Sequence, residues 1–430
     1  MSIDFAVVVG AGVSGQAAAR LLARSGARVR LLEKNAGRIT AAFADWAAQN
    51  GVEIRCGEHA PADFAGADVV IPSPGAAASA IRKLLPQTAA PEIMAETELA
   101  WRELHGERVI GITGTSGKTT TTSLCSAMLQ AAGLRVFTGG NIGTPLSEYI
   151  LARDAGQPAA DVVVLELSSF QLQTCSLLRP DVGVLLNISE NHLDYHADMQ
   201  EYIGAKMHLF ARQTSKDTAI LHEGLQSLAE TYHLAARRIY FDTSDRFGHM
   251  RLLGEHNKAN AEAALLACQA LGVDEATAIR AAEAFEPLEH RLERVAERDG
   301  VLFVNDSKAT TVEALRVALN AFDRPILLLA GGKFKGGDLE GLRPLIQQKT
   351  RHLALFGASR QIFEKAWGDL VPVSYDTTLE EALQRLAGAG GIARPGDVVL
   401  LAPATSSFDQ YTDYLHRGRD FKRIVKEILA

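Results

Sequence analysis

The chain has 430 residues, of which 47% are hydrophobic and 22% are charged, so it is long and apolar enough to form two or three globular domains. Its net charge of −7 and its scattered basic residues argue against nucleic acid or an anionic membrane as the partner. Four cysteines without metal or disulfide spacing, no leader segment and no apolar stretch of membrane length predict a cytoplasmic protein.

The first segment begins with an apolar strand that runs into a glycine-rich turn. Residues 5–9 precede Gly10-Ala-Gly-Val-Ser-Gly15, a G-x-G-x-x-G pattern that binds a diphosphate at the start of a helix. A second strand ends on Glu33, about 20 residues further along, where such folds place the acid that holds a ribose. The pattern is typical of proteins that bind NAD or FAD, and it equally suits a UDP-sugar. Glu33 could instead be a solvated acid at a strand end.

The second segment contains the most specific motif in the chain. A short apolar strand leads into G-T-S-G-K-T-T at residues 114–120, and a helix follows. Backbone N–H groups and the positive end of that helix bind phosphate, Lys118 adds charge for the outer phosphates, and the Thr119 hydroxyl suits Mg²⁺. The motif is a shortened P-loop, because Ile112 stands where the usual pattern has its first glycine. We therefore expect the chain to bind a nucleoside triphosphate.

Three further polar residues follow apolar runs in this segment. Asn141 lies in a loop dense in turn residues, Glu166 closes a buried strand, and His192 comes just past the next strand. An acid at the carboxyl end of a strand beside a P-loop can hold Mg²⁺. Glu166 could instead cap the helix that begins near Ser168, and a lone histidine such as His192 is often structural.

A helix over residues 201–210 places a lysine among aromatic side chains. Tyr202, Lys206 and Phe210 share one face at helical spacing, although lysines usually lie on the solvated face. Desolvation there would lower the pKa of Lys206 and favour the neutral amine. The alternative is a snorkelling lysine whose ammonium group reaches water.

The last segment alternates strands with helices, and each strand runs into a polar loop. In a parallel sheet these loops would gather at the carboxyl edge, where ligands bind. Lys308 and Lys335 lie on two of them and suit an anionic substrate.

Along its whole length the sequence resembles the Mur ligase family. The shared blocks are the shortened P-loop, G-N-I-G at 140–143, L-E-L-S-S-F-Q-L at 165–172, L-N-I-S-E-N-H-L-D at 186–194, A-K at 205–206, H-N-x-x-N at 256–260, H-R at 290–291, N-D-S-K-A-T at 305–310 and S-F-D-Q-Y at 407–411. N-D-S-K-A-T is typical of the members that add D-glutamate. Ala402 and Tyr414 depart from the family's usual Ser and Phe at the border of the amino-acid pocket.

The resemblance implies an α/β fold with three domains. These are a Rossmann-like domain over 1–92 that binds the UDP-substrate, a P-loop ATPase domain over 93–287, and a Rossmann-like, glutamate-binding domain over 288–430. The implied activity is ATP-dependent addition of D-glutamate to UDP-N-acetylmuramoyl-L-alanine through an acyl phosphate, in cytoplasmic peptidoglycan synthesis. A related ligase of the Mur and folylpolyglutamate group that uses another amino acid, such as L-glutamate, is the alternative. The resemblance also implies a monomer that acts on small molecules only.

The resemblance also assigns the site residues. The nucleotide set is Gly114, Thr115, Ser116, Gly117, Lys118, Thr119, Thr120, Asn260, Arg291 and Asp306. Two Mg²⁺ ions would be held by Thr119, Glu166, His192 and Lys206, with Lys206 carbamylated because a protonated lysine cannot bind a cation. The UDP-substrate set is Ser14, Glu33, Lys34, Gly75, Asn141 and His192. The glutamate set is Lys308, Thr310, Lys335, Ser407 and Tyr414. The residues expected to act in catalysis are Lys118, His192 and Lys206.

Two other classes of protein fit parts of the sequence. A nicotinamide-dependent dehydrogenase would explain the first glycine-rich turn but would leave the P-loop without a role. A non-catalytic nucleotide-binding regulator would keep the P-loop but would not need Glu166, His192 and Lys206 together.

Overall fold

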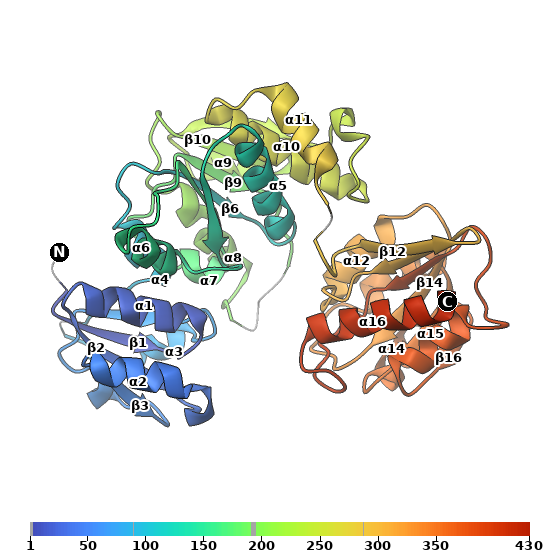
Figure 1. Ribbon diagram of the computed structural model, residues 1–430, viewed down its shortest axis with the longest axis horizontal. Helices are drawn as coiled ribbons and strands as arrows, with labels where there is room; N and C mark the ends of the chain where they lie inside the picture. Colours follow the sequence, from blue (N-terminus) through green and yellow to red (C-terminus); the bar gives the residue numbers. More distant parts are fainter. Residues whose placement is uncertain (1–2, 89, 191–194, 287) are drawn as a thin grey trace. The chain divides into compact units, whose positions relative to one another are not determined.

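The computed structural model describes residues 3–88, 90–190, 195–286 and 288–430. These residues form three β-sheets, each flanked by helices (Figure 1). The first two sheets belong to one compact unit, Met1–Phe247 with Ala259–Ala282. The third sheet belongs to a second unit, Gly248–Lys258 with Glu283–Ala430.

Strands and helices alternate along most of the chain. The strands are β1 Phe5–Val9, β2 Arg28–Glu33, β3 Glu53–Cys56, β4 Val69–Pro72, β5 Glu92–Ile93, β6 Arg108–Thr113, β7 Val136–Gly140, β8 Val162–Glu166, β9 Val182–Leu185, β10 Thr218–His222, β11 Arg237–Phe241, β12 Glu293–Arg298, β13 Val301–Asn305, β14 Ile326–Gly331, β15 Thr350–Phe356, β16 Val373–Tyr375 and β17 Val398–Leu401. The helices are α1 Val13–Arg24, α2 Ala41–Gln49, α3 Ala78–Arg82, α4 Glu96–Trp101, α5 Lys118–Ala131, α6 Leu146–Asp154, α7 Ser169–Leu172, α8 Met199–Met207, α9 Gln226–Thr231, α10 Glu255–Ala270, α11 Glu275–Ala284, α12 Val312–Asn320, α13 Arg343–Lys349, α14 Arg360–Trp367, α15 Leu379–Ala387 and α16 Tyr414–Leu429.

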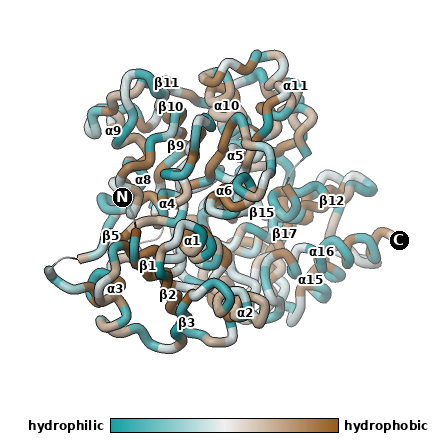
Figure 2. Tube along the Cα trace, turned by 60° about the vertical axis from the view of Figure 1, so that its left-hand side comes forward, coloured by the Kyte–Doolittle hydropathy of each residue, from teal (hydrophilic) through white to brown (hydrophobic). Residues whose placement is uncertain are grey.

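The first sheet is parallel and has the order β3-β2-β1-β4-β5. Its central strands are buried on both faces, because Ala6 and Val8 pack with α1 and α2 while Val7 and Val9 pack on the opposite side. A strand covered on both faces is apolar at every position, which explains the unbroken run at β1. Figure 2 shows the hydrophobic character of β1 and β2. The glycine-rich turn lies at the carboxyl end of β1.

The second sheet, also parallel, has the order β11-β10-β9-β6-β8-β7. The P-loop follows β6, which lies between β9 and β8 and so holds the loop at the centre of the sheet's carboxyl edge. Glu166 ends the neighbouring strand β8. The expected strands at β6, β8 and β9 are present. Residues 136–140, which the sequence did not indicate as a strand, form β7. Gly139 and Gly140, expected in a loop, are therefore the last two residues of a strand.

The third sheet has the order β12-β13-β17-β14-β15-β16. The four strands expected from the sequence form its parallel centre, and α12, α13 and α14 cover one face while α15 and α16 cover the other. The edge strand β12 runs antiparallel to β13. Its sequence E-R-V-A-E-R has no apolar run, which is why the sequence did not indicate it.

Two further expectations concern cysteines and membranes. All four cysteines are free thiols, with Cys56 exposed and the other three buried. Over the described part of the chain, no helix combines the length and the apolar character needed to cross a bilayer.

The core of the third sheet supplies a stability prediction. Trp367 is fully buried on α14, stacks on Phe363 with ring centroids 4.8 Å apart, and donates from Nε1 to the Leu339 carbonyl at 3.0 Å. Trp367→Ala should lower the free energy of unfolding by about 3–5 kcal/mol because it leaves a cavity. The matched control is Ile362→Ala, an exposed position on the same helix, which should change it by about 0.5 kcal/mol or less. Urea unfolding followed by circular dichroism measures both, and equal losses would contradict the packing described.

Candidate active site

The P-loop turns into α5 through a glycine that no other residue could replace without strain. Gly117 is the N-cap of α5 and has φ +81°. A Cβ added there would lie 2.4 Å from Oδ1 of Asn260, which is buried on α10. Asn260, assigned to the nucleotide on resemblance, therefore packs directly against the loop. Thr119 and Thr120 occupy the first turn of α5.

The P-loop is held from the side by two residues to which the sequence analysis assigned no role. The Asn187 side chain accepts from the Ser116 N–H at 2.9 Å and donates to the Ser116 carbonyl at 3.2 Å. The Tyr202 hydroxyl lies 2.9 Å from Oγ1 of Thr115. Asn187 belongs to the L-N-I-S block and Tyr202 to the aromatic face of the Lys206 helix, so both signals were present in the sequence without an assigned role.

Two lysines converge on one carbonyl oxygen of the P-loop. Lys118 Nζ donates to the Gly114 carbonyl at 2.8 Å and to the Thr115 carbonyl at 3.0 Å. Lys206 Nζ donates to the same Gly114 carbonyl at 2.9 Å. The structure thus brings together the two lysines that the resemblance assigns to catalysis.

Lys206 is buried and not a snorkelling lysine, so that alternative is wrong. Its side chain is 1% exposed, on a face that Tyr202 and Phe210 share at 1% and 2% exposure. Burial lowers the pKa of Lys206 to about 6, with the neighbouring charge of Lys118 as the second cause. At neutral pH the amine is therefore mostly uncharged.

Glu166 has the features of a cation ligand. Its Oε1 accepts from Nδ2 of Asn141 at 2.8 Å, whereas Oε2 is buried and has no hydrogen-bond partner among the described residues. The capping alternative is wrong, because the Ser168 side chain caps α7 itself. A buried carboxylate oxygen without a donor fits a hard cation such as Mg²⁺.

The rest of the expected metal set is only partly described. Thr119 lies in the first turn of α5, whereas His192 lies outside the described residues. Within the ranges that the structure describes, no three His, Cys, Asp or Glu side chains gather in a metal-binding group. Of the expected metal ligands, Glu166 is the one described residue of those four types.

The four UDP-substrate candidates of the first sheet line one cavity. Ser14, Glu33, Lys34 and Gly75 surround a volume of about 720 Å³ at the carboxyl ends of β1, β2 and β4. Lys34 is exposed and pairs with Glu58 at 2.9 Å. The fifth described candidate, Asn141, lies beside Glu166 and not in this cavity.

Glu33 is buried, so its interpretation as a solvated strand-end acid is wrong. One carboxylate oxygen accepts from the Ala11 N–H at 2.8 Å and the other from the Asn35 N–H at 2.9 Å. Burial raises the pKa of Glu33, but these two hydrogen bonds and nearby positive charges outweigh it, and the pKa lies below its usual value. The ionised carboxylate therefore fixes the glycine-rich turn on one side of the cavity.

The second unit carries the remaining two nucleotide candidates, which lie close to each other. Asp306 follows β13, and its Oδ1 accepts from the Leu292 N–H at 3.3 Å. Burial raises the pKa of Asp306 to about 7, and the Leu292 bond and the Arg291 charge oppose the rise. His290, beside Arg291, is held by Asn305, whose Nδ2 lies 2.8 Å from the histidine Nδ1.

The glutamate candidates lie on the loops after β13, β14 and β17 and at the start of α16. Lys308 Nζ stands 4.0 Å from the Tyr414 ring centroid, and the Thr310 N–H donates to the Lys308 carbonyl at 2.8 Å. Lys335 is exposed, with Nζ 5.4 Å from the Phe408 ring centroid. The adjoining Ser407 is buried. All five candidates belong to the second unit.

Arg417 is a buried residue of this region that the sequence analysis missed. It is 0% exposed on α16, and burial lowers its pKa to about 10. The sequence did contain a signal for it, because helical spacing places Arg417 on the same face as the buried Phe421 and Ile424. Lys206 lies on an apolar face of α8 in the same way.

The fold and the site define an α/β nucleotide-binding protein of the P-loop class, and comparisons with known proteins narrow this class. Residues 112–245 match the Mur ligase middle domain, residues 290–405 match the Mur ligase glutamate ligase domain, and residues 8–67 match an NAD(P)-binding Rossmann-like domain. The chain is 60% identical over 425 residues to the UDP-N-acetylmuramoylalanine–D-glutamate ligase of Nitratidesulfovibrio vulgaris, covering 99% of this chain and 96% of that one. The corresponding ligase of Lawsonia intracellularis is 54% identical, with 98% and 94% covered.

Solved structures agree at the level of the fold. The MurF ligase of Thermotoga maritima in complex with ADP has a TM-score of 0.61 at 18% identity, covering 93% of this chain and 95% of that one. A pseudomurein peptide ligase of Methanothermus fervidus has a TM-score of 0.58 at 18% identity, covering 99% and 100%. The chain belongs to the Mur ligase family.

The low pKa of Lys206 predicts how stability depends on pH. Between a folded pKa of about 6 and an unfolded pKa of about 10.4, the unfolded chain holds a proton that the folded chain lacks, so wild-type stability rises with pH in this window. Lys206→Met removes that rise. The free energy of unfolding of Lys206→Met, relative to that of the wild type, should therefore fall by roughly 2.5 kcal/mol between pH 7 and pH 9.

Urea unfolding at several pH values in buffer free of carbon dioxide measures this difference. Lys216→Met, at an exposed lysine, is the control and should follow the wild type at every pH. Parallel curves for Lys206→Met and wild type would show that Lys206 is charged in the folded protein.

Proposed function

We propose that this protein is an ATP-dependent ligase that joins D-glutamate to UDP-N-acetylmuramoyl-L-alanine in peptidoglycan synthesis. Relatives at 54–60% identity that match nearly the whole chain carry the name of this activity. The single observation that carries the proposal is the meeting of Lys118 and a buried, neutral Lys206 at the Gly114 carbonyl. A regulator that only binds a nucleotide has no need of an uncharged lysine there.

Amide formation needs an activated acid, because a carboxylate is a poor acceptor for an amine. The alanine carboxylate attacks the γ-phosphorus of ATP, and ADP leaves. The amine of glutamate then attacks the acyl carbon of the acyl phosphate, and inorganic phosphate leaves. Lys118 and the N–H groups at the start of α5 would neutralise the phosphates during the first step and hold them in line. Catalysis therefore rests on positioning and charge.

Thr119, Glu166 and Lys206 support the metal ions and the carbamate that the resemblance implies, whereas His192 lies outside the described residues. Thr119 and Glu166 would hold one Mg²⁺, and His192 with Lys206 a second. Neutral Lys206 is the form that combines with carbon dioxide to give a carboxylate-like ligand. Bound metal would neutralise phosphate charge. Asn260, Arg291 and Asp306 would contact the nucleotide.

The two other substrates would occupy the remaining candidate regions. The cavity lined by Glu33 has the size and the diphosphate-binding turn for the UDP end, and Asn141 would contact the muramoyl-alanine end. Lys308, Lys335 and Tyr414 would receive the amino acid, the lysines pairing with its carboxylates.

The protein would act as a cytoplasmic monomer on small molecules. Its domains would be residues 1–92 for the UDP end of the substrate, 93–287 for ATP and 288–430 for glutamate, with Asn141, Arg291 and Asp306 reaching the substrates of other domains.

A ligation assay tests the proposal. The protein is incubated with UDP-N-acetylmuramoyl-L-alanine, ATP, Mg²⁺ and one amino acid, and the product is identified by mass. D-glutamate should be incorporated with release of one phosphate per product. Incorporation of L-glutamate alone would favour the related ligases, and substrate-independent nucleotide binding without product would favour a regulator. Oxidation of NADH would instead indicate a dehydrogenase.

Glu33→Ala separates the UDP-substrate from the nucleotide. The change removes the acceptor for Ala11 and Asn35 and loosens the turn, so the KM for the UDP-substrate should rise about tenfold or more while the KM for ATP stays within about twofold. Steady-state kinetics measures both constants. Glu53→Ala, at a largely exposed acid on β3, is the control and should change neither. An equal rise in both constants would mean that the wrong ligand has been assigned to this cavity.

Lys206→Arg tests whether the lysine acts as a carbamate. Arginine is a basic side chain of similar length but cannot be carbamylated, so Lys206→Arg should be as inactive as Lys206→Ala. The alanine variant leaves a cavity, so acetate at high concentration should restore part of its activity, whereas the larger arginine blocks that space. ¹³C-bicarbonate NMR should show a carbamate carbon in the wild type only. Near-normal activity of Lys206→Arg would rule out the carbamate.

A further inference from the structure

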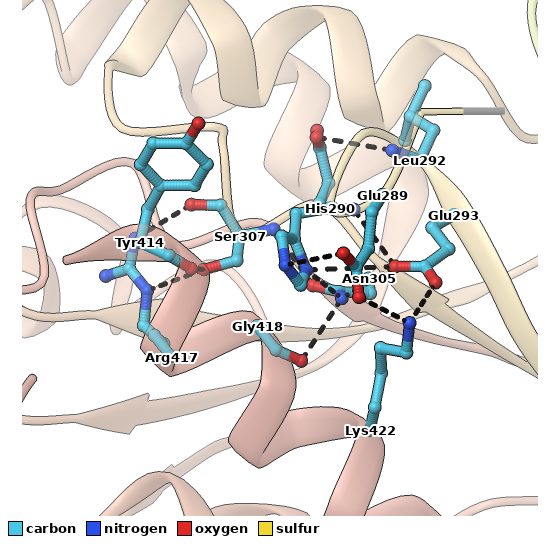
Figure 3. Close-up of polar contacts among 11 residues, drawn as sticks. Glu289, His290, Leu292, Glu293, Asn305, Ser307, Tyr414, Arg417, Gly418 and Lys422 are labelled. Atoms are coloured by element: carbon cyan, nitrogen blue, oxygen red, sulfur yellow. Dashed lines mark hydrogen bonds and ion pairs between the residues drawn. The ribbon is translucent and has the colours of Figure 1, made fainter.

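The N-D-S-K-A-T block contains one polar residue without an assigned role, Ser307. It lies between Asp306, a nucleotide candidate, and Lys308, a glutamate candidate, and it is fully buried. Its hydroxyl donates to the Tyr414 carbonyl at 2.8 Å and accepts from Nε of Arg417 at 3.0 Å (Figure 3). Since a serine hydroxyl has one proton, these two bonds fix the direction of that proton.

Arg417 continues this network to two other loops of the same sheet edge. One of its terminal nitrogens donates to the Ser307 carbonyl at 2.9 Å and to the Thr405 carbonyl at 3.1 Å. The other lies 3.5 Å from the Gly331 carbonyl. One guanidinium group therefore joins the loops that follow β13, β14 and β17. These are the loops that carry Lys308, Lys335 and Ser407.

The close packing around this guanidinium demands unusual backbone conformations. Gly332 has φ +131°, and a Cβ added there would lie 2.3 Å from Oγ1 of Thr405 and 3.1 Å from a terminal nitrogen of Arg417. Ala404, next to Thr405, has φ +58°, which costs energy for a residue with a side chain. Strained backbone of this kind is kept where the surrounding structure fixes it for a function.

The electrostatics of Arg417 argue against a purely structural role. In the part of the second unit that the structure describes, every oxygen that accepts a hydrogen bond from its guanidinium is neutral, and Asp409 acts on it through charge alone. Burying a charge without a hydrogen-bonded carboxylate is costly, and an apolar side chain would serve stability better. The positive charge is therefore only partly compensated at the sheet edge, where it favours an anionic ligand.

We propose that Ser307 and Arg417 form a positioning pair for the amino-acid substrate. The pair holds Tyr414 and Lys308 in register and adds positive charge beneath the site, without touching the substrate. Because Lys308 Nζ stands 4.0 Å from the Tyr414 ring centroid, a shift of either residue changes the other. This inference rests on the proposed ligase activity and concerns only the recognition of glutamate.

The experiment compares variants of the 430-residue chain in steady-state kinetics with all three substrates. Ser307→Ala removes both hydroxyl bonds but keeps the buried volume nearly unchanged. Arg417→Lys keeps the charge but loses the forked geometry that joins three loops. The matched controls are Ser374→Ala, a partly buried serine on β16 that bonds His352, and Arg419→Gln, an exposed arginine on α16.

Ser307→Ala should raise the KM for D-glutamate roughly tenfold, and Arg417→Lys should raise it further. The KM values for ATP and for the UDP-substrate should stay within about twofold. Both variants should also discriminate less between D-glutamate and D-glutamine, because the positive charge is displaced. The two controls should match the wild type.

Two outcomes would overturn the inference. One is an unchanged KM for D-glutamate in folded Ser307→Ala. The other is an equal rise of all three KM values together with a lower melting temperature in both variants, which would assign the pair to stability alone. Failure of the wild type to incorporate any acidic amino acid would instead refute the proposed function, so the two failures are distinguishable.

Discussion

The Gly114 carbonyl oxygen, which accepts from both Lys118 and Lys206, is the interaction on which the P-loop region depends. Two ammonium groups cannot share one acceptor in a buried space without strong repulsion. Lys206 is the more deeply buried of the two, and it is the one that loses its proton. The same helix face supplies Tyr202, whose hydroxyl bonds the loop at Thr115. The burial of Lys206, the loss of its proton and the geometry of the P-loop are therefore consequences of how α8 packs against that loop.

Loop rigidity in this protein comes from side chains that lie behind the loops. Asn187 fixes Ser116, Glu33 fixes the first glycine-rich turn, and Arg417 fixes the loops of the third sheet. In each case, one polar side chain replaces hydrogen bonds that the irregular backbone cannot make with itself. Residues expected to touch substrates are thus presented on backbone that is already ordered, which lowers the entropic cost of binding.

Much of this arrangement was predictable from residue patterns. Apolar runs followed by glycine, lysine or acid predicted the central strands and the ligand edge of each sheet, because a parallel strand is buried on both faces. The aromatic face of α8 predicted a desolvated Lys206. The charged strand β12 and the short strands at sheet edges gave no such pattern. The motif block of Asn187 and the helix face of Arg417 marked these residues, but their partners could not be predicted, since most of them are backbone atoms distant in sequence.

The edge strand β12 has a consequence for how the molecule behaves in a crowded solution. An open sheet edge offers unpaired N–H and C=O groups to any other extended chain. β12 carries charges of both signs, and its pairing with β13 shifts register between Arg294 and Ala296. At the opposite edge, β16 has only three residues. Charge, irregularity and shortness each discourage another strand from docking, so the third sheet is protected at both ends against growth into fibres.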